Sequence, residues 1–232
     1  MYKLIVFDLD NTLAPLGKPI PQSVLCELKG FLDKGLRLAV CSGKPTYYLC
    51  GFMRAAGLPD TILVGENGAV IDFGVSLPPK EHYSLPVSQE ARDALSFVNS
   101  SLHKLLGHNV WFQPNQSGVT PFPVTTEEFK IVQDFIDSHA AELSPLNVYR
   151  HCDSFDFVPK NVNKKEGLAR LCNRLGISDA EVIAVGDSGN DFPMFEFAGF
   201  SIGISLPDNE KHRVTTAVET IDEAVEVIKR IL

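Results

Sequence analysis

Two pairs of carboxylates, each at the end of an apolar run, are the residues of this sequence best suited to chemistry. Asp8 and Asp10 follow the apolar start of the chain, and Asp187 and Asp191 follow the apolar run 182–185. Carboxylates this close together repel one another unless a cation, a proton or a hydrogen-bond donor compensates them. Oxygen ligands suit Mg²⁺, whereas Zn²⁺ prefers His and Cys, which neither acidic segment contains. The two segments together predict a Mg²⁺ site.

A purely structural role is the alternative for these acids. Asp and Asn often cap the turn or helix that follows a strand, and either pair alone fits that role. Two independent capping turns on adjoining strands would, however, leave four carboxylates side by side without compensation, which costs free energy. We therefore favour a binding role for the four acids.

Strands and helices alternate in the parts of the chain that carry these acids. Apolar runs predict the strands, and apolar residues at helical spacing predict the helices. The expected strands are 1–7, 36–41, 61–64, 181–185 and 200–204, and the expected helices are 21–34, 46–56, 164–175 and 221–231. The dipeptide Asn67-Gly68 predicts a tight turn into a further extended segment over 69–73. This alternation predicts an α/β fold, namely a Rossmann-like, three-layer, doubly wound parallel sheet. The carboxyl ends of its strands meet at one edge, where such sheets bind ligands.

The pattern changes after the dipeptide Pro78-Pro79, which is typical of a linker. From there to about residue 159, two expected helices and three extended segments form a block of about 80 residues, the size of a small domain. We expect an α+β cap over residues 80–159, inserted into a catalytic core made of residues 1–79 and 160–232.

Composition limits the partners of the chain. Its 232 residues carry a net charge of −8, which does not suit the phosphate backbone of a nucleic acid. No stretch approaches the roughly 20 apolar residues of a membrane span, and the start lacks the pattern of a secretory signal. We expect a cytoplasmic protein with neither a nucleic-acid nor a membrane partner, and its oligomeric state stays open.

The five cysteines are scattered and include no Cys-x-x-Cys pair, a pattern typical of reduced thiols. Cys41 directly precedes Ser42, so a nucleophilic thiol is one interpretation of this position. The apolar residues before Cys41 favour the other interpretation, a thiol buried at the end of a strand.

Four short motifs occur in a fixed order along the chain. They are Asp8-x-Asp10-x-Thr12, Ser42-Gly43, Lys164 and Gly186-Asp187-x-x-Asn190-Asp191. In this combination the sequence resembles the haloacid dehalogenase-like hydrolases over nearly its whole length. The insert, preceded by Glu66-Asn67-Gly68-Ala69, is similar to the C2-type cap of the type IIB branch.

This resemblance implies a role for each matched residue. Asp8 would attack phosphorus and become an aspartyl phosphate, and Asp10 would carry protons to the leaving group and from water. The implied ligands of Mg²⁺ are Asp8, the main-chain carbonyl of Asp10 and Asp187, with Asp191 either a further ligand or a support for the others. The implied phosphate-binding residues are Ser42, Gly43, Lys164 and Asn190. Lys164 is preferred over its neighbour Lys165 because the apolar residues of the following helix then fall in the family's register.

The implied function is an Mg²⁺-dependent phosphatase that acts on a small phosphorylated metabolite, such as a sugar phosphate or a phosphoglycolate-like compound. A phosphomannomutase-like phosphomutase is the nearest alternative, because it would use the same motifs. A receiver-type signalling module also combines Asp, Mg²⁺, a hydroxyl and a Lys on a parallel sheet. Receivers are about half this length and carry no inserted cap.

Overall fold

The computed structural model describes all 232 residues, which divide into two compact units. The core unit consists of Met1–Ser84 and Asn163–Leu232, and the insert consists of Leu85–Val162. Each unit has its own hydrophobic core. The chain therefore leaves the first unit, builds the insert and returns.

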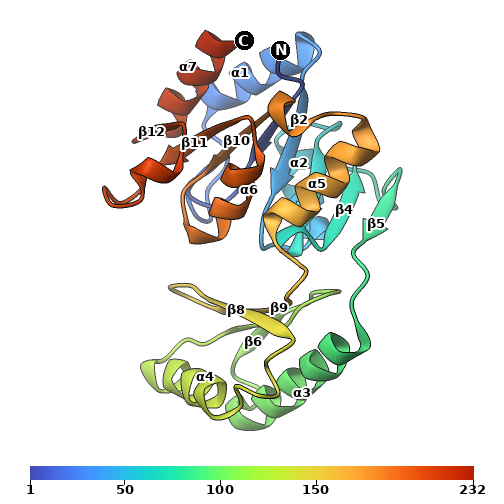
Figure 1. Cartoon of the computed structure of the whole chain (residues 1–232), viewed down its shortest axis with the longest axis vertical. Coiled ribbons are helices and arrows are strands. Elements are labelled where there is room, and N and C mark those ends of the chain that lie inside the picture. Colours follow the sequence, from blue (N-terminus) through green and yellow to red (C-terminus); the bar gives the residue numbers. More distant parts are fainter. The chain divides into compact units, whose positions relative to one another are not determined.

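The core unit is built on one sheet with the strand order β12-β11-β10-β1-β2-β3-β4-β5 (Figure 1). Its strands are β1 Leu4–Phe7, β2 Arg37–Cys41, β3 Ile62–Gly65, β4 Val70–Phe73, β5 His82–Ser84, β10 Val182–Gly186, β11 Phe200–Ile204 and β12 Thr216–Val218. The six strands from β12 to β3 run parallel, whereas β4 and β5 pair antiparallel.

Alternating side chains of the central strands cover both faces of this sheet with apolar surface. In β1, Ile5 and Phe7 join the cluster formed with α1, α2 and α7, while Leu4 and Val6 join the cluster formed with α5 and α6. The helices are α1 Gln22–Asp33, α2 Thr46–Ala55, α5 Lys164–Leu175, α6 Phe192–Phe197 and α7 Ile221–Ile231. Burial of a strand on both faces explains its continuous apolar run. The predicted three-layer, Rossmann-like fold is confirmed.

Two details differ from the expectation. The sheet is not wholly parallel, because the Asn67-Gly68 turn sends β4 back along β3. The chain also rejoins the sheet after Pro78-Pro79, since β5 pairs with β4. The first boundary of the insert therefore falls after Ser84, rather than after residue 79 as expected.

The second boundary is also a few residues later than expected. The insert ends at Val162, whereas the sequence placed its end at 159. Residues 160–162 stay with the insert because the Lys160 amide donates to Pro145 O at 3.1 Å and the Val162 amide donates to Pro159 O at 2.8 Å.

The order of the strands determines where the acidic turns lie. From β1 the chain continues outward through β2 and β3, and after the insert it starts again at β10 on the other side of β1. The direction of winding therefore reverses between β1 and β10, and ligands of open α/β sheets bind outside the strand ends at such a point. Both acidic segments begin at these two strand ends.

The insert has two helices packed on one face of its strands (Figure 1). Its elements are α3 Gln89–Leu106, β6 Trp111–Gln113, β7 Thr120–Phe122, α4 Thr126–Ser138, β8 Leu146–Arg150 and β9 Phe155–Pro159. Phe155 and Phe157 of β9 point into the apolar cluster with the helices, whereas Asp156 between them accepts a hydrogen bond from Thr120 Oγ1 at 2.7 Å. One face of the strands is therefore apolar and the other carries polar groups.

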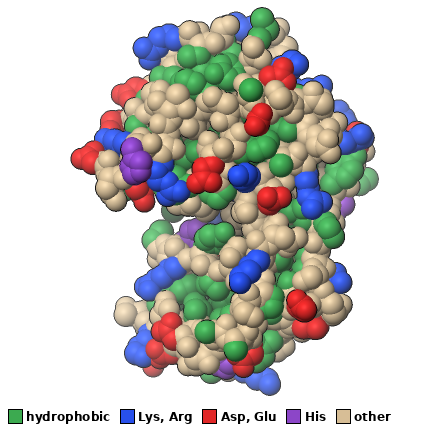
Figure 2. All heavy atoms as spheres, in the orientation of Figure 1, with side chains coloured by type: hydrophobic (Ala, Val, Ile, Leu, Met, Phe, Trp, Pro, Cys, Tyr) green, Lys and Arg blue, Asp and Glu red, His purple; other side chains and the backbone are tan.

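None of the helices has the length and the apolar composition needed to cross a membrane. On the face drawn in Figure 2, acidic and basic side chains are interspersed with hydrophobic ones in both units.

The start of α5 packs directly on the short 3₁₀ helix η1 (Glu66–Gly68) through two glycines. A Cβ atom on Gly167 would lie 2.6 Å from the Cα of Gly68 and 2.9 Å from its carbonyl oxygen. Gly68 itself has a φ of 101°, in the region that L-residues rarely adopt. This contact sets the position of the first turn of α5.

Gly167→Ala should therefore destabilise the protein, by about 1–3 kcal/mol, because the methyl group has no room beside the Gly68 backbone. Gly51→Ala is the matched control, since Gly51 lies inside α2 and a methyl group added there would meet no atom within 4 Å. Alanine at that position should stabilise by up to about 1 kcal/mol. Urea unfolding of both variants measures the difference, and equal effects at the two positions would contradict the packing argument.

Candidate active site

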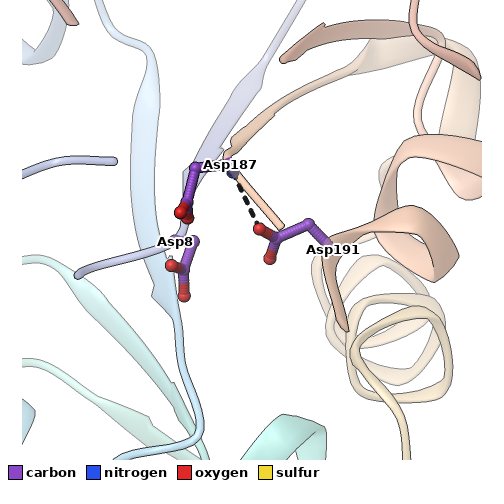
Figure 3. Close-up of side chains that lie close together, drawn as sticks. All are labelled: Asp8, Asp187 and Asp191. Carbon is purple, nitrogen blue, oxygen red and sulfur yellow. Dashed lines mark hydrogen bonds between the residues drawn. The ribbon is translucent and has the colours of Figure 1, made fainter. Parts of the chain in front are cut away.

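The two acidic segments meet at the carboxyl end of the sheet. Phe7 of β1 lies opposite Val185 of β10, so the residues that follow these strands are neighbours. One carboxylate oxygen from each of Asp8, Asp187 and Asp191 lies within 4.8 Å of the other two. Figure 3 shows the three side chains converging from the two strand ends and the following turn.

Asp191 is fixed by the turn that carries it. Its Oδ2 accepts hydrogen bonds from the backbone amides of Asp187 at 2.9 Å and Ser188 at 3.0 Å (Figure 3). Gly186 makes this approach possible, because a Cβ atom there would lie 2.5 Å from the Asp191 carboxylate. Asp191 is wholly buried, and backbone donors of this kind stabilise a buried carboxylate.

Lys164, the first residue of α5, joins the cluster as its only cation. Its Nζ donates to Asp8 Oδ1 at 2.6 Å and to Asp191 Oδ1 at 2.5 Å. The Lys164 side chain is completely buried, whereas the neighbouring Lys165 is exposed. The preferred register thus places the matched lysine, and not its neighbour, beside the acids.

Burial dominates the acid-base behaviour of the cluster. Burial raises the pKa of Asp8 to about 7, and the Lys164 ammonium lowers it again only in part. Burial and the charge of Asp191 raise the pKa of Asp187 to about 6. For Lys164, burial lowers the pKa, but Asp191 and Asp8 together outweigh burial and the net shift is upward. The cluster therefore holds protons that a cation would displace.

Asp10 lies at the edge of this cluster. Its carboxylate is partly exposed, and Oδ2 lies 3.9 Å from the Nζ of Lys44. Asn11, which follows it, has a φ of 59°, a left-handed conformation that Asn tolerates better than most residues. The side chain of Asp10 is not one of the three converging carboxylates.

The loop after β2 brings the Ser42-Gly43 motif to the neighbouring strand end. Ser42 is buried, its Oγ accepts from the Lys44 amide at 3.2 Å and its carbonyl accepts from the Asn67 amide at 3.0 Å. The Asn190 Nδ2 lies 3.5 Å from Asn67 Oδ1. Segment 65–68 therefore connects the loops that carry Ser42 and Asn190.

Cys41 is the last residue of β2 and is buried in the core. Burial raises the pKa of its thiol to about 12, far from the value a nucleophilic thiol needs at neutral pH. All five cysteines are free. The interpretation of Cys41 as a buried core residue is confirmed.

Three supporting features were not assigned a role from the sequence. Thr12 was matched only as part of the first motif, yet its Oγ1 donates to Asp187 Oδ1 at 3.0 Å. Glu66 and Asn67 are buried and have φ values of 52° and 57°, a strained conformation that often marks functional segments. The Asn-Gly dipeptide indicated a turn at this place, but the sequence did not reveal that the turn contacts α5.

Removal of Lys164 should destabilise the metal-free protein. Lys164→Met leaves Asp8 and Asp191 buried without a cation, which should lower the free energy of unfolding by about 3–5 kcal/mol near neutral pH. Lys165→Met removes the same charge from an exposed position and should change little. Chemical denaturation of both variants in EDTA measures the effect, and equal stability would show that the ion pairs contribute nothing.

Comparison with known proteins adds independent evidence. A model of the haloacid dehalogenase-like hydrolase family matches residues 5–84 and 119–221. A phosphoglycolate phosphatase of Methanoculleus marisnigri is 25% identical over 227 residues, which cover 96% of this chain and 91% of the relative.

Solved structures show the same fold. A haloacid dehalogenase-like hydrolase from Bacteroides thetaiotaomicron superposes with a TM-score of 0.80 at 21% identity, with 100% of both chains covered. The subclass IIB sugar phosphatase BT4131 superposes with a TM-score of 0.74 at 22% identity, with 99% of this chain and 98% of that chain covered. The resemblance predicted from the four motifs is confirmed, as is the prediction of a hydrolytic enzyme. The chain belongs to the haloacid dehalogenase-like hydrolase family.

Proposed function

We propose that this hydrolase is an Mg²⁺-dependent phosphatase that cleaves a small phosphorylated metabolite through an aspartyl phosphate on Asp8. The observation that carries the proposal is the buried pairing of Asp8 with Lys164 beside Asp187 and Asp191. The names of the relatives support the reaction class, since one is a phosphoglycolate phosphatase and a solved neighbour is a sugar phosphatase. They differ in substrate, so either a sugar phosphate or a phosphoglycolate-like compound fits the proposal.

The donor set fits Mg²⁺. When ionised, the three converging carboxylates and one ammonium leave two uncompensated negative charges, which a divalent cation would neutralise. All donors are oxygens, as a hard cation requires. We assign Asp8, the main-chain carbonyl of Asp10 and Asp187 as direct ligands. When bound, Mg²⁺ supplies positive charge that lets an anionic nucleophile and an anionic phosphate approach each other.

Asp191 is better suited to holding the loop that carries Asp187 and the Lys164 ammonium in place than to serving only as a ligand of the cation. Its Oδ2 already accepts from two amides and its Oδ1 accepts from Lys164. It therefore fixes both the loop that carries Asp187 and the ammonium that faces Asp8. We propose this supporting role for Asp191, with any direct coordination additional to it.

Asp8 is positioned to act as the nucleophile. Lys164 holds its Oδ1 at 2.6 Å, which leaves Oδ2 for attack on phosphorus. Bond formation between Oδ2 and phosphorus expels the substrate oxygen, and a proton from Asp10 neutralises that oxygen. Asp10 then takes a proton from the water that hydrolyses the aspartyl phosphate. Phosphoryl transfer depends mostly on positioning and charge stabilisation, and Lys164 supplies a charge that is present before the substrate arrives.

Ser42, Gly43 and Asn190 are proposed to bind the phosphate oxygens. Ser42 and Gly43 lie in the turn after β2, next to the strand end that carries Asp8. Hydroxyl, backbone amide and carboxamide groups are suitable donors to phosphate. Their hydrogen bonds to segment 65–68 and to the Lys44 amide limit how far these groups can move.

Two substitutions separate the roles of the first acidic pair. Asp8→Asn removes the nucleophile and should abolish Mg²⁺-dependent phosphate release from a panel of phosphate esters. Asp10→Asn removes the proton carrier but keeps the main-chain carbonyl, so it should lower turnover by about 10²–10⁴-fold while Mg²⁺ binding changes little. Turnover assays and Mg²⁺ titrations of both variants decide the matter. Equal loss of Mg²⁺ affinity in both would refute the division of roles, and isomerised product without phosphate release would indicate a phosphomutase.

The stabilisation by Mg²⁺ should depend on pH. The pKa values of Asp8 and Asp187 are raised to about 7 and about 6, so the metal-free folded protein holds protons that the unfolded chain has released. These groups therefore destabilise the metal-free protein as pH rises from about 4 to about 7, and Mg²⁺ must displace their protons at lower pH. The increase in melting temperature on adding Mg²⁺ should be larger at pH 8 than at pH 5.5. An equal increase at both pH values would argue against Mg²⁺ binding at these acids.

A further inference from the structure

A second lysine lies at the edge of the site, beside the proposed proton carrier. The Nζ of Lys44 lies 3.9 Å from Asp10 Oδ2, and 24% of each of these two side chains is exposed. Lys164 contacts different acids, because its Nζ donates to Asp8 and Asp191. The proposed nucleophile and the proposed proton carrier therefore each face their own ammonium.

The turn after β1 fixes the main chain of Asp10. The Asn11 amide donates to Ala14 O at 2.8 Å, and the Ala14 amide donates to Leu9 O at 3.0 Å. These hydrogen bonds fix the backbone around Asp10, but they do not orient its carboxylate, which rotates about the side-chain torsions. An orienting contact has to come from a neighbouring side chain.

The loop after β2 supplies such a contact from a fixed position. The Lys44 amide donates to Ser42 Oγ at 3.2 Å, and the Lys44 carbonyl accepts from the Glu66 amide at 3.0 Å. A Cβ atom on Gly65 would lie 2.9 Å from the Lys44 carbonyl oxygen, so the two chain segments pack closely here. The backbone that carries the ammonium is therefore fixed, as the backbone of Asp10 is.

Tyr48, in the first turn of α2, lies on the same side of Asp10 as the loop after β2. Burial raises the pKa of the Tyr48 hydroxyl, and the carboxylate of Asp10 raises it further. Because an anion acts on a titratable group in this way only at short range, Asp10 lies near Tyr48 as well as near Lys44. The start of α2 therefore flanks the pair formed by Asp10 and Lys44.

The orientation of Asp10 decides which of two tasks its carboxylate performs. A carboxylate beside Asp8 and Asp187 is drawn to the divalent cation that those residues would hold, and a carboxylate bound there could not carry protons. The ammonium of Lys44 draws the same carboxylate towards the loop that carries Ser42. Because Ser42 is a proposed phosphate donor, a carboxylate held there lies beside the phosphate and the oxygen that leaves it.

We propose that Lys44 is a positioning residue, which holds the carboxylate of Asp10 beside the leaving oxygen and away from the cation. The inference rests on the phosphatase function proposed above and adds no bond-making step to it. Asp10 still gives the proton to the leaving oxygen and later takes one from water. An ion pair this exposed contributes little to stability, but a displacement of about 1 Å in a reacting group can lower a rate about 10²-fold.

Two kinds of phosphate ester separate this role from direct binding of the substrate. Glucose 6-phosphate and 2-phosphoglycolate release an alkoxide that needs a proton, whereas p-nitrophenyl phosphate releases a phenolate that is stable without one. We would measure kcat/KM, which covers the steps up to expulsion of the leaving group. Lys44→Gln should lower kcat/KM about tenfold more for the two alkyl esters than for p-nitrophenyl phosphate, because only the alkyl esters depend on the proton from Asp10.

Three further variants test whether Lys44 acts through Asp10. Lys44→Arg keeps the charge and should restore most of kcat/KM for the alkyl esters. Lys165→Gln removes the same charge from an exposed position and should leave the ratio between the two kinds of ester at its wild-type value. In an Asp10→Asn background, Lys44→Gln should have no further effect on the alkyl esters, because residues that act as a unit are not additive.

Mg²⁺ titration by calorimetry gives a readout that needs no turnover. Lys44→Gln should bind Mg²⁺ about two- to fivefold more tightly, because the carboxylate of Asp10 is then released towards the cation. The gain should disappear in the Asp10→Asn background. A gain that persists there would show that Lys44 acts on Mg²⁺ through its charge alone, which would contradict a role through Asp10.

The kinetic outcomes distinguish failure of this inference from failure of the proposed function. Equal loss of kcat/KM for both kinds of ester in an active enzyme would overturn the inference alone, since Lys44 would then bind the phosphate directly. Absence of Mg²⁺-dependent phosphate release by the wild type would overturn the proposed function and the inference with it. Melting temperatures identify losses caused by misfolding, and Lys44→Met is the second variant if Lys44→Gln does not fold.

Discussion

The organisation of the core unit depends on one buried ammonium. Lys164 Nζ bridges Asp8 and Asp191 at 2.6 and 2.5 Å, with its side chain removed from water. Burying three ionised groups costs several kcal/mol per ion unless each is closely compensated. The compensation here is local, since Asp191 also accepts two backbone amides. The first turn of α5 and the turn after β10 must therefore keep their positions relative to the end of β1.

The rest of the core unit supplies those positions. Reversal of the winding direction between β1 and β10 places two acidic turns side by side, and the contact of Gly167 with Gly68 holds α5 against η1. Segment 65–68, with its left-handed residues, connects this contact to the loops of Ser42 and Asn190. Asp8, which we propose as the nucleophile, Lys164 and the proposed phosphate donors thus belong to one packed arrangement, and none of them sits on an isolated loop.

Much of the fold and of the site could be predicted from the sequence, because the apolar runs and the short motifs are both local signals. Apolar runs that end in acids give the strands and the acidic edge, and four motifs in order give the family. Strand β4 was expected as an extended segment after the Asn67-Gly68 turn, but β5 was missed because a short, exposed edge strand such as His82–Ser84 has no apolar pattern. The Gly68–Gly167 contact and the hydrogen bond from Thr12 to Asp187 join residues far apart in sequence. No periodicity reports such pairs, so only the structure could reveal them.

The claim that Asp8 becomes phosphorylated is the centre of this account. Rapid quenching during turnover, followed by borohydride reduction and peptide mass spectrometry, tests it directly, because reduction converts an aspartyl phosphate to homoserine. The account predicts homoserine at position 8 only when both substrate and Mg²⁺ are present. Homoserine at position 10, 187 or 191, or its absence at every aspartate while the phosphorylated enzyme can be trapped by mass, would contradict it.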